Sequence, residues 1–148
     1  MSYLLDASAL VPLLSGFGKQ LIVKAAEIRL FTTDLAVYES GNSLWKLSTL
    51  LRSISLEDAA EVMGVLRDVT TRGIIQATRF GDLDLARAVK MASKEGTTFY
   101  DSSYILAAEG RGATLVTEDR KLREAASKYI GTMTYTDFQR SIMLGKGQ

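Results

Sequence analysis

The sequence predicts an α/β fold whose central, mostly parallel sheet is covered by helices on both faces. Short apolar runs, of the kind that form buried strands, alternate along the chain with longer helical segments. Two of these runs are followed by an acidic residue. The length suits one domain, and the chain contains no repeat, low-complexity tract or linker, so a single domain over residues 1–148 is expected.

The individual elements follow from apolar runs, helix caps and stop residues. The predicted strands cover residues 2–6, 30–33, 74–80, 113–117 and 132–136. The predicted helices cover residues 19–29, 34–52, 55–73, 82–96, 100–109 and 120–128. Asp34, Ser55 and Asp82 are the expected N-terminal caps of three of these helices.

The composition narrows the chemistry that a functional site could use. The chain has no cysteine and no histidine, which excludes disulfides, thiolate or imidazole metal ligands, and Ser-His-Asp or Cys-His catalysis. Any metal ion must be bound by oxygen, which favours Mg²⁺ or Mn²⁺. With 18 basic and 17 acidic residues the net charge is +1, so only a local basic patch could attract a polyanion.

The N-terminal region is not expected to be a secretory signal. It lacks the basic start of a secretory signal, and Asp6 interrupts its apolar stretch. No apolar run reaches the roughly 20 residues that a membrane span needs. We therefore expect a cytoplasmic protein without membrane contact.

Four acidic residues stand where a parallel α/β fold could bring them together. Asp6 ends the first strand, and Asp119 follows two residues after Thr117, the end of another. Ligands of such folds bind beyond the carboxyl ends of the strands. Asp101 lies at the start of a helix rich in small residues, and Glu39 lies on the helix after the second strand. Plainer explanations stay open: Asp101 as a first-turn acid and Asp119 as a helix cap.

The helix that carries Glu39 has two distinct faces. At about 100° per residue, one arc of about 80° is apolar and holds Val37, Leu44, Leu47 and Leu51. Another face holds Glu39, Asn42, Ser43 and Lys46, either as part of a site or as an ordinary solvated surface. Trp45 and Leu50 fall outside the apolar arc and are candidate interface residues, unless Trp45 packs under a neighbouring helix of the same chain.

A cluster of carboxylates has a chemical use that stability alone rarely provides, because like charges repel. One or two Mg²⁺ or Mn²⁺ ions can bridge the acids and a phosphodiester. The metal then makes hydroxide available near neutral pH and stabilises the charge that builds on the phosphate. Phosphodiester hydrolysis by this route needs neither histidine nor cysteine.

Four motifs occur in order along the chain: LLDASAL with Asp6 and Ser8, VYESGNSL with Glu39 and Asn42, TTFYDSSYILAAE with Asp101, and GATLVTEDRKL with Thr117 and Asp119. In this order and context they resemble the motifs of the PIN-domain nucleases, in particular the VapC-type toxins of toxin–antitoxin pairs. The resemblance spans almost the whole chain, and none of the four acids departs from it.

The resemblance implies a three-layer α/β/α fold and an endoribonuclease that depends on Mg²⁺ or Mn²⁺. Asp6, Glu39, Asp101 and Asp119 would form the metal site, with Ser8, Asn42 and Thr117 as supporting polar groups. The resemblance also implies a homodimer and a small antitoxin protein that binds beside the site.

Other functions remain open at this point. A stand-alone RNA-processing nuclease would carry the same residues, and a PIN-like binding module could keep the fold without cleavage. A phosphatase of the haloacid-dehalogenase type is disfavoured, because Ser8 stands where that class needs an acid.

Cations near the acids are the expected contacts of the RNA backbone. Lys46 shares the helix face of Glu39, and Arg120, Lys121 and Arg123 follow Asp119. We predict that Lys46 and Arg120 bind substrate phosphates. The alternative for each is a solvated charged surface.

Overall fold

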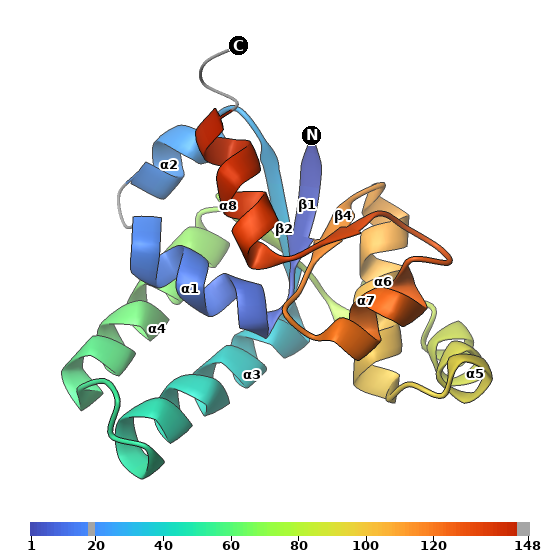
Figure 1. Ribbon diagram of the computed structural model, residues 1–148, viewed down its shortest axis with the longest axis horizontal. Coiled ribbons are helices and arrows are strands. Elements are labelled where there is room, and N and C mark those ends of the chain that lie inside the picture. Colours follow the sequence, from blue (N-terminus) through green and yellow to red (C-terminus); the bar gives the residue numbers. More distant parts are fainter. Residues whose placement is uncertain (18–19, 145–148) are drawn as a thin grey trace.

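The computed structural model describes residues 1–17 and 20–144, and its strands form one twisted sheet (Figure 1). Five strands of this part of the chain pair in the order β3-β2-β1-β4-β5, and each pair is parallel. They are β1 (Ser2–Leu5), β2 (Arg29–Thr33), β3 (Ile75–Thr78), β4 (Thr114–Val116) and β5 (Thr132–Met133). The predicted parallel α/β fold is confirmed.

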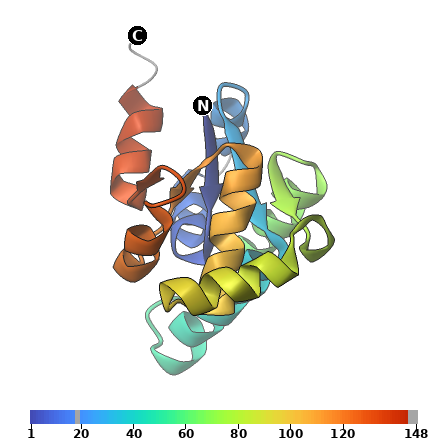
Figure 2. The ribbon, with the colours of Figure 1, turned by 90° about the vertical axis from the view of Figure 1, so that its right-hand side faces the viewer.

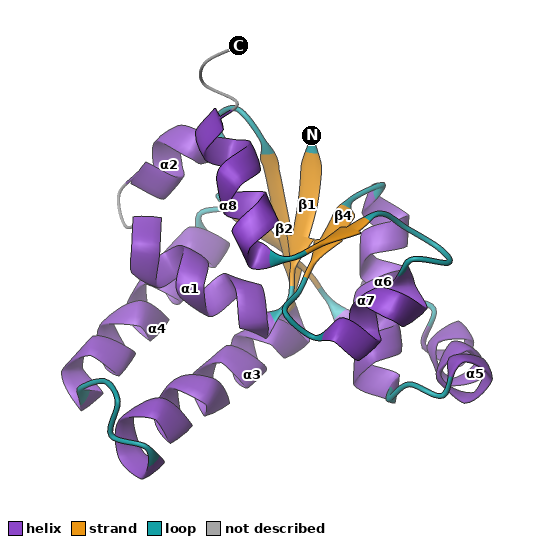
Figure 3. Ribbon diagram, in the orientation of Figure 1, coloured by secondary structure: helices purple, strands orange, loops and turns teal. Residues whose placement is uncertain are grey.

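Helices cover both faces of the sheet and make three layers (Figures 1 and 3). One face carries α5 (Leu85–Glu95), α6 (Phe99–Arg111) and α7 (Arg120–Ala126). The other carries α1 (Ala7–Phe17), α2 (Gln20–Ala25), α3 (Asp34–Trp45), α4 (Leu56–Thr71) and α8 (Tyr135–Leu144). None of these described helices combines the length and apolar character that a bilayer span requires.

The strand order creates a switch point between β1 and β4. The chain runs from β1 outward to β2 and β3, then crosses back to β4 and continues to β5 on the other side. The β1–β4 ladder continues past Leu5, because the Asp6 amide donates to the carbonyl of Val116 at 3.3 Å. In open parallel sheets, ligands bind in the crevice beyond such a point. Asp6, which directly follows β1, lines this crevice.

The central strands and α6 form the core. Leu4, Leu5 and Leu115 are fully buried, as expected for strands covered on both faces. Figure 2 shows α6 lying across the sheet, and its residues 102–108 are all buried. Its small side chains, Ser102, Ser103, Ala107 and Ala108, permit this close approach. The position of Asp101 at the start of α6 is therefore fixed by the core.

Several element boundaries differ from the prediction. Residues 7–17, for which no element is predicted, form α1 with Pro12 inside it, since one missing amide does not outweigh the burial of its apolar face. The predicted helix over 19–29 is α2, which ends at Ala25, and residue 19 lies outside the described residues. It ends early because the chain must turn before Arg29, whose amide donates to the carbonyl of Met1.

Two of the three predicted caps sit one or two residues from the observed ones. Thr33 caps α3 by accepting from the Ala36 amide at 3.1 Å, and Asp34 is its first residue. Asp84, not Asp82, caps α5, because a 3₁₀ turn (Phe80–Asp82) comes first. Ser55 caps α4 as predicted.

The second half of the predicted helix 34–52 changes its winding. Residues Lys46–Leu50 form a π-helix, in which the Leu51 amide donates to the carbonyl of Lys46 five residues earlier. The wider turn rotates the following residues out of the α-helical phase. Leu51, placed in the apolar arc by that phase, is therefore 70% exposed, whereas Leu44 is buried as predicted.

The predicted last strand over 132–136 is shortened to Thr132–Met133 by a helix that the sequence pattern misses. Thr134 accepts from the Asp137 amide at 3.2 Å, and Glu118 accepts from the Tyr135 amide at 2.6 Å. These side chains satisfy the first free amides of α8. The cap from Glu118 is a long-range contact, which the local sequence does not reveal.

Candidate active site

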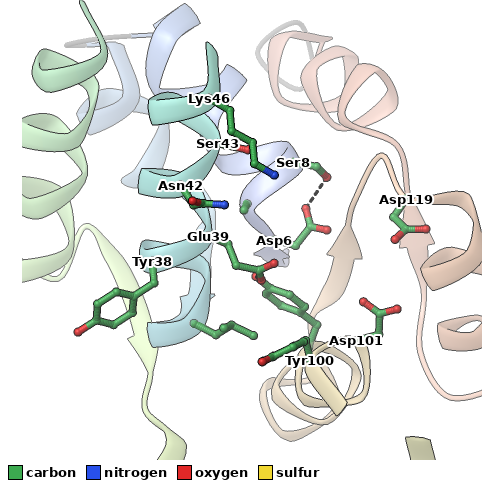
Figure 4. A pocket seen from close by; sticks show the side chains of 13 residues that line it. Asp6, Ser8, Tyr38, Glu39, Asn42, Ser43, Lys46, Tyr100, Asp101 and Asp119 are labelled. Atoms are coloured by element: carbon green, nitrogen blue, oxygen red, sulfur yellow. Dashed lines mark hydrogen bonds between the residues drawn. The ribbon is translucent and has the colours of Figure 1, made fainter. Parts of the chain in front are cut away.

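The four predicted acids line one cleft of about 560 Å³ beyond the carboxyl ends of the strands (Figure 4). Asp6 follows β1, Glu39 projects from α3, Asp101 from the first turn of α6, and Asp119 from the start of α7. Four segments far apart in sequence thus contribute one carboxylate each. Figure 4 shows Glu39 and Asp6 facing Asp101 and Asp119 across the cleft.

Asp6 is held by hydroxyl groups on both sides. Ser8 donates to one of its oxygens at 2.6 Å, and the buried Thr117 donates to the other. The Ala9 amide adds a bond at 3.2 Å, so Asp6 also caps α1. Ser8 in turn accepts from the Glu118 amide at 2.9 Å, which links the loop after β4 to the start of α1. The Asp6 carboxylate is therefore fixed in orientation.

Glu39 is oriented by a buried tyrosine. The hydroxyl of Tyr104 donates to Oε1 of Glu39 at 2.6 Å. Tyr104 lies on α6 one turn after Asp101, so a single helix supplies one acid and fixes the position of another. Burial and the negative charge of Glu39 raise the pKa of Tyr104 well above its usual value, so its proton stays in place at any physiological pH. Tyr104 acts here as a hydrogen-bond donor and not as an acid.

Asp101 and Asp119 are placed by helix starts. Thr98 caps α6 and accepts from the Asp101 amide at 3.1 Å, and Asp119 caps α7 by accepting from the Leu122 amide at 3.2 Å. The plain explanations of these two acids, first-turn residue and helix cap, are therefore structurally correct. They do not compete with a site, because the N-termini of α1, α6 and α7 all open onto the cleft and their dipoles favour negative charge there.

The surroundings of the cleft nevertheless raise the pKa of two of its acids, Asp6 and Asp101. Burial is the main cause of the raised pKa of Asp6, opposed by its hydrogen bonds and reinforced by the charge of Glu39. The pKa of Asp101 is raised by partial burial and then by the charges of Asp119 and Glu39. A cation in the cleft would offset the repulsion of Asp6 by Glu39 and of Asp101 by Asp119 and Glu39.

The predicted supporting residues fall into different places. Asn42, Ser43 and Lys46 line the cleft together with Glu39, as the helical phase predicts, and so does Ser8. Thr117 lies behind the lining and acts through Asp6.

The predicted cations after Asp119 are arranged less favourably. Arg120 is not among the described residues that line the cleft, and its guanidinium faces Glu124 at 3.1 Å on the surface. Arg123 donates to the carbonyl of Thr117 at 2.6 Å, which gives it a structural role. The positive charge of Lys121 opposes the raised pKa of Asp101, but it is weaker than the burial and the neighbouring acids that raise that pKa.

The donor set of the cleft fits a hard divalent cation. All four acids offer oxygen, and histidine and cysteine are absent from the chain. In the described part of the chain no three acidic side chains stand close enough to hold a metal ion by themselves. Mg²⁺ does not need such a cage, since it is usually bound by one or two carboxylates together with water and substrate phosphate.

Three aromatic residues of the cleft were not foreseen from the sequence. Tyr104 is buried, whereas Tyr38 and Tyr100 line the cleft and are exposed. A retrospective pattern exists: Tyr38 directly precedes Glu39, Tyr100 directly precedes Asp101, and Tyr104 follows Asp101 by three residues. Only the fold shows that all three meet in one place.

The fold and the cleft define a doubly wound, all-parallel α/β protein with an acidic ligand cleft at its switch point. The sequence model of the PIN domain matches residues 3–128, so the chain belongs to the PIN-domain family.

Relatives agree with this assignment. The chain is 35% identical over 122 residues to exonuclease VapC9 of Pyrobaculum aerophilum, covering 82% of this chain and 84% of that protein. It is 33% identical over 131 residues to ribonuclease VapC3 of the same organism, covering 84% and 94%. The chain is therefore related to the VapC nucleases over most of its length.

Solved structures show the same fold. The crystal structure of PAE2754 from Pyrobaculum aerophilum aligns with a TM-score of 0.73 at 30% identity, covering 97% of this chain and 96% of that one. The structure of VapBC-1 from nontypeable Haemophilus influenzae aligns with a TM-score of 0.54 at 17% identity, covering 92% and 99%. The second likeness concerns the fold alone.

Proposed function

We propose that the protein is a Mg²⁺- or Mn²⁺-dependent endoribonuclease and the toxin of a toxin–antitoxin pair. The observation that carries the proposal is the meeting of Asp6, Glu39, Asp101 and Asp119 in one cleft at the switch point. Kinship with VapC nucleases supports nuclease activity, although one relative is named an exonuclease and the other a ribonuclease.

In this proposal the four acids hold the cation together with water and a phosphate of the substrate, and the remaining groups arrange the cleft. The bound cation would supply Lewis acidity toward the phosphate and lower the pKa of an attacking water. Ser8 and Thr117 keep Asp6 in one orientation, and Tyr104 does the same for Glu39. Lys46 lines the cleft on the same side as Glu39, and in this proposal it contacts a phosphate of the substrate.

Cleavage of a circular RNA tests both the activity and its endonucleolytic character. A circle has no ends, so only an endonuclease converts it to a linear product. We expect conversion with Mg²⁺ or Mn²⁺, none in excess EDTA, and none by Asp101→Asn. A linear structured RNA that is trimmed while the circle stays intact would instead establish an exonuclease, and full cleavage in EDTA would refute the metal mechanism.

The proposed partners are a second copy of the chain and a small antitoxin. Large apolar side chains are exposed along α3, the π-helix and the start of α4: Trp45, Leu50, Leu51 and Leu56. Large apolar side chains that are exposed close together in the sequence, an aromatic among them, are typical of protein interfaces. An antitoxin could place a cation among the four carboxylates and so compete with the metal.

Light scattering after size exclusion tests the dimer, with Trp45→Ala expected to weaken it. Co-purification from the native host tests the antitoxin. A strictly monomeric protein that never retains a small partner would favour a stand-alone RNA-processing nuclease. A chain that folds but cleaves no RNA with any divalent cation would favour a silent binding module.

A further inference from the structure

Two exposed tyrosines stand at the mouth of the cleft beside the acids. Tyr38 is 79% exposed and Tyr100 is 58% exposed, yet both line the same cleft. Each directly precedes an acid, Glu39 on α3 and Asp101 on α6. Neighbouring residues on a helix point about 100° apart, so neither ring covers the carboxylate that follows it in the sequence (Figure 4).

The two tyrosines make few specific interactions with the rest of the described chain. Among residues 1–17 and 20–144, neither phenol hydroxyl makes a hydrogen bond to another side chain or to the backbone. Among the described aromatic residues, the ring of Tyr100 pairs with that of Phe99 alone, in an edge arrangement with centroids 6.4 Å apart. By contrast, Tyr104 in the same cleft is buried and hydrogen-bonded. The exposed pair is therefore available to a ligand that offers flat, apolar faces.

Resting on the proposed function, we propose that Tyr100 and Tyr38 are base-binding subsites on which nucleobases of the RNA stack. Aromatic side chains bind bases through their π-faces without sequence preference. Bases inside a duplex have their faces covered by neighbouring pairs, so only unpaired nucleotides can use these rings. With Lys46 on the phosphate, the rings would hold nucleotides that flank the bond presented to the acids.

The two rings are not equivalent. Figure 4 shows Tyr100 beneath Glu39 and next to Asp101, whereas the Tyr38 ring points away from the acids toward the outer edge. Tyr100 is therefore the subsite for a base beside the scissile phosphate, and Tyr38 serves a base further along the strand. Loss of Tyr100 should cost more affinity than loss of Tyr38.

Binding of a short single-stranded RNA that carries one 2-aminopurine tests the subsites. The Asp119→Asn background with Mg²⁺ prevents cleavage, so anisotropy reports affinity and quenching of 2-aminopurine reports stacking on an aromatic ring. We expect Tyr100→Ala to weaken binding about 5- to 150-fold, the range that one stacked base contributes, and to relieve the quenching. Tyr38→Ala should act in the same direction with a smaller effect.

Matched variants separate stacking from other roles. Tyr100→Phe and Tyr38→Phe keep the ring and should bind like the parent, while Phe80→Ala removes an exposed aromatic that does not line the cleft and should change nothing. The same sequence as a duplex should bind more weakly and be indifferent to both tyrosines. Quenching in the parent protein gives an answer even if an alanine variant fails to fold.

Three results would overturn the inference: unchanged affinity in both alanine variants, equal losses for single strand and duplex, or retained RNA binding with loss of a protein partner. The last would assign the rings to a protein interface. Failure of the proposed function looks different, because the unsubstituted chain would then cleave no RNA whatever the tyrosines do to binding.

Discussion

The two walls of the cleft hold their acids in different ways. On one wall, side-chain hydroxyls donate to both acids. Ser8 and Thr117 donate to Asp6, and Tyr104 donates to Glu39. On the opposite wall, Asp101 and Asp119 take their places from helix starts. Hydroxyls donate to both oxygens of Asp6 and to one oxygen of Glu39. On the opposite wall Asp119 is held by one amide, that of Leu122, and Asp101 takes its location from the start of its helix. One wall is therefore preorganised, and the other can adjust to a cation and substrate.

The largest effect should come from removing any of the acids, because both walls must contribute. Asp6→Asn, Asp101→Asn and Asp119→Asn should each lower RNA cleavage by at least about 100-fold while circular dichroism shows an intact fold. Glu118→Gln is the matched control, since Glu118 stands between Thr117 and Asp119 but caps α8 instead of lining the cleft. Loss of folding in all three aspartate variants would mean that the acids are structural.

A smaller loss should follow when an acid of the preorganised wall keeps its carboxylate but loses the hydroxyl that donates to it. Tyr104→Phe deletes only the hydroxyl that orients Glu39, and we expect Mn²⁺ affinity measured by calorimetry to fall about 10-fold. Tyr3→Phe is the control, because Tyr3 is equally buried but packs on Phe138 away from the cleft. If the two variants bind Mn²⁺ alike, Tyr104 has no positioning role.

Asp6 should likewise become less effective when one of its hydroxyl donors is removed. Thr117→Val keeps the shape of the side chain but removes its donor to Asp6, whereas Thr117→Ser keeps the donor. The valine variant should lose cleavage by about 10-fold relative to the serine variant. Equal activities would show that the location of Asp6 suffices without its orientation.

On the adjustable wall, Asp101 should lower the stability of the metal-free protein at neutral pH. The folded pKa of Asp101 is raised, so its contribution to stability is fully present below its ordinary pKa and is lost as the pH rises through the folded pKa. At pH 7 in EDTA, Asp101→Asn should therefore melt higher than the parent, by about 2–4 °C for each ~1 kcal/mol of relieved repulsion. The gap should close toward pH 4 or when Mg²⁺ is added to the parent. A lower melting temperature at pH 7 would contradict the raised pKa.

The smallest effects concern the surface cations. Lys46→Ala should flatten the dependence of RNA affinity on salt by close to one phosphate contact, about 0.7 in the log–log slope for a single strand. Arg120→Ala should change the slope less, because Arg120 lies outside the cleft lining and faces Glu124. A larger change for Arg120 than for Lys46 would move the RNA path to α7.

The sequence predicts the parts of this molecule that local patterns encode. Apolar runs place the strands, and helical phase puts Glu39, Asn42, Ser43 and Lys46 on one face. Prediction from local patterns fails where contacts between residues far apart in the sequence determine the structure. Glu118 caps α8 across the fold, and the π-helix after Trp45 turns Leu51 outward. Tyr104 was missed for the same reason, since its partner Glu39 lies 65 residues away.

Mn²⁺ binding, followed by electron paramagnetic resonance, shows whether the four carboxylates contribute to one divalent-cation site. The parent protein should remove free Mn²⁺ from solution. Asp6→Asn and Asp119→Asn, one from each wall, should each weaken that binding by about 10-fold or more, while Glu118→Gln should match the parent. A parent that binds no Mn²⁺, or aspartate variants that bind it as tightly as the parent, would rule out a cation site shared by these carboxylates.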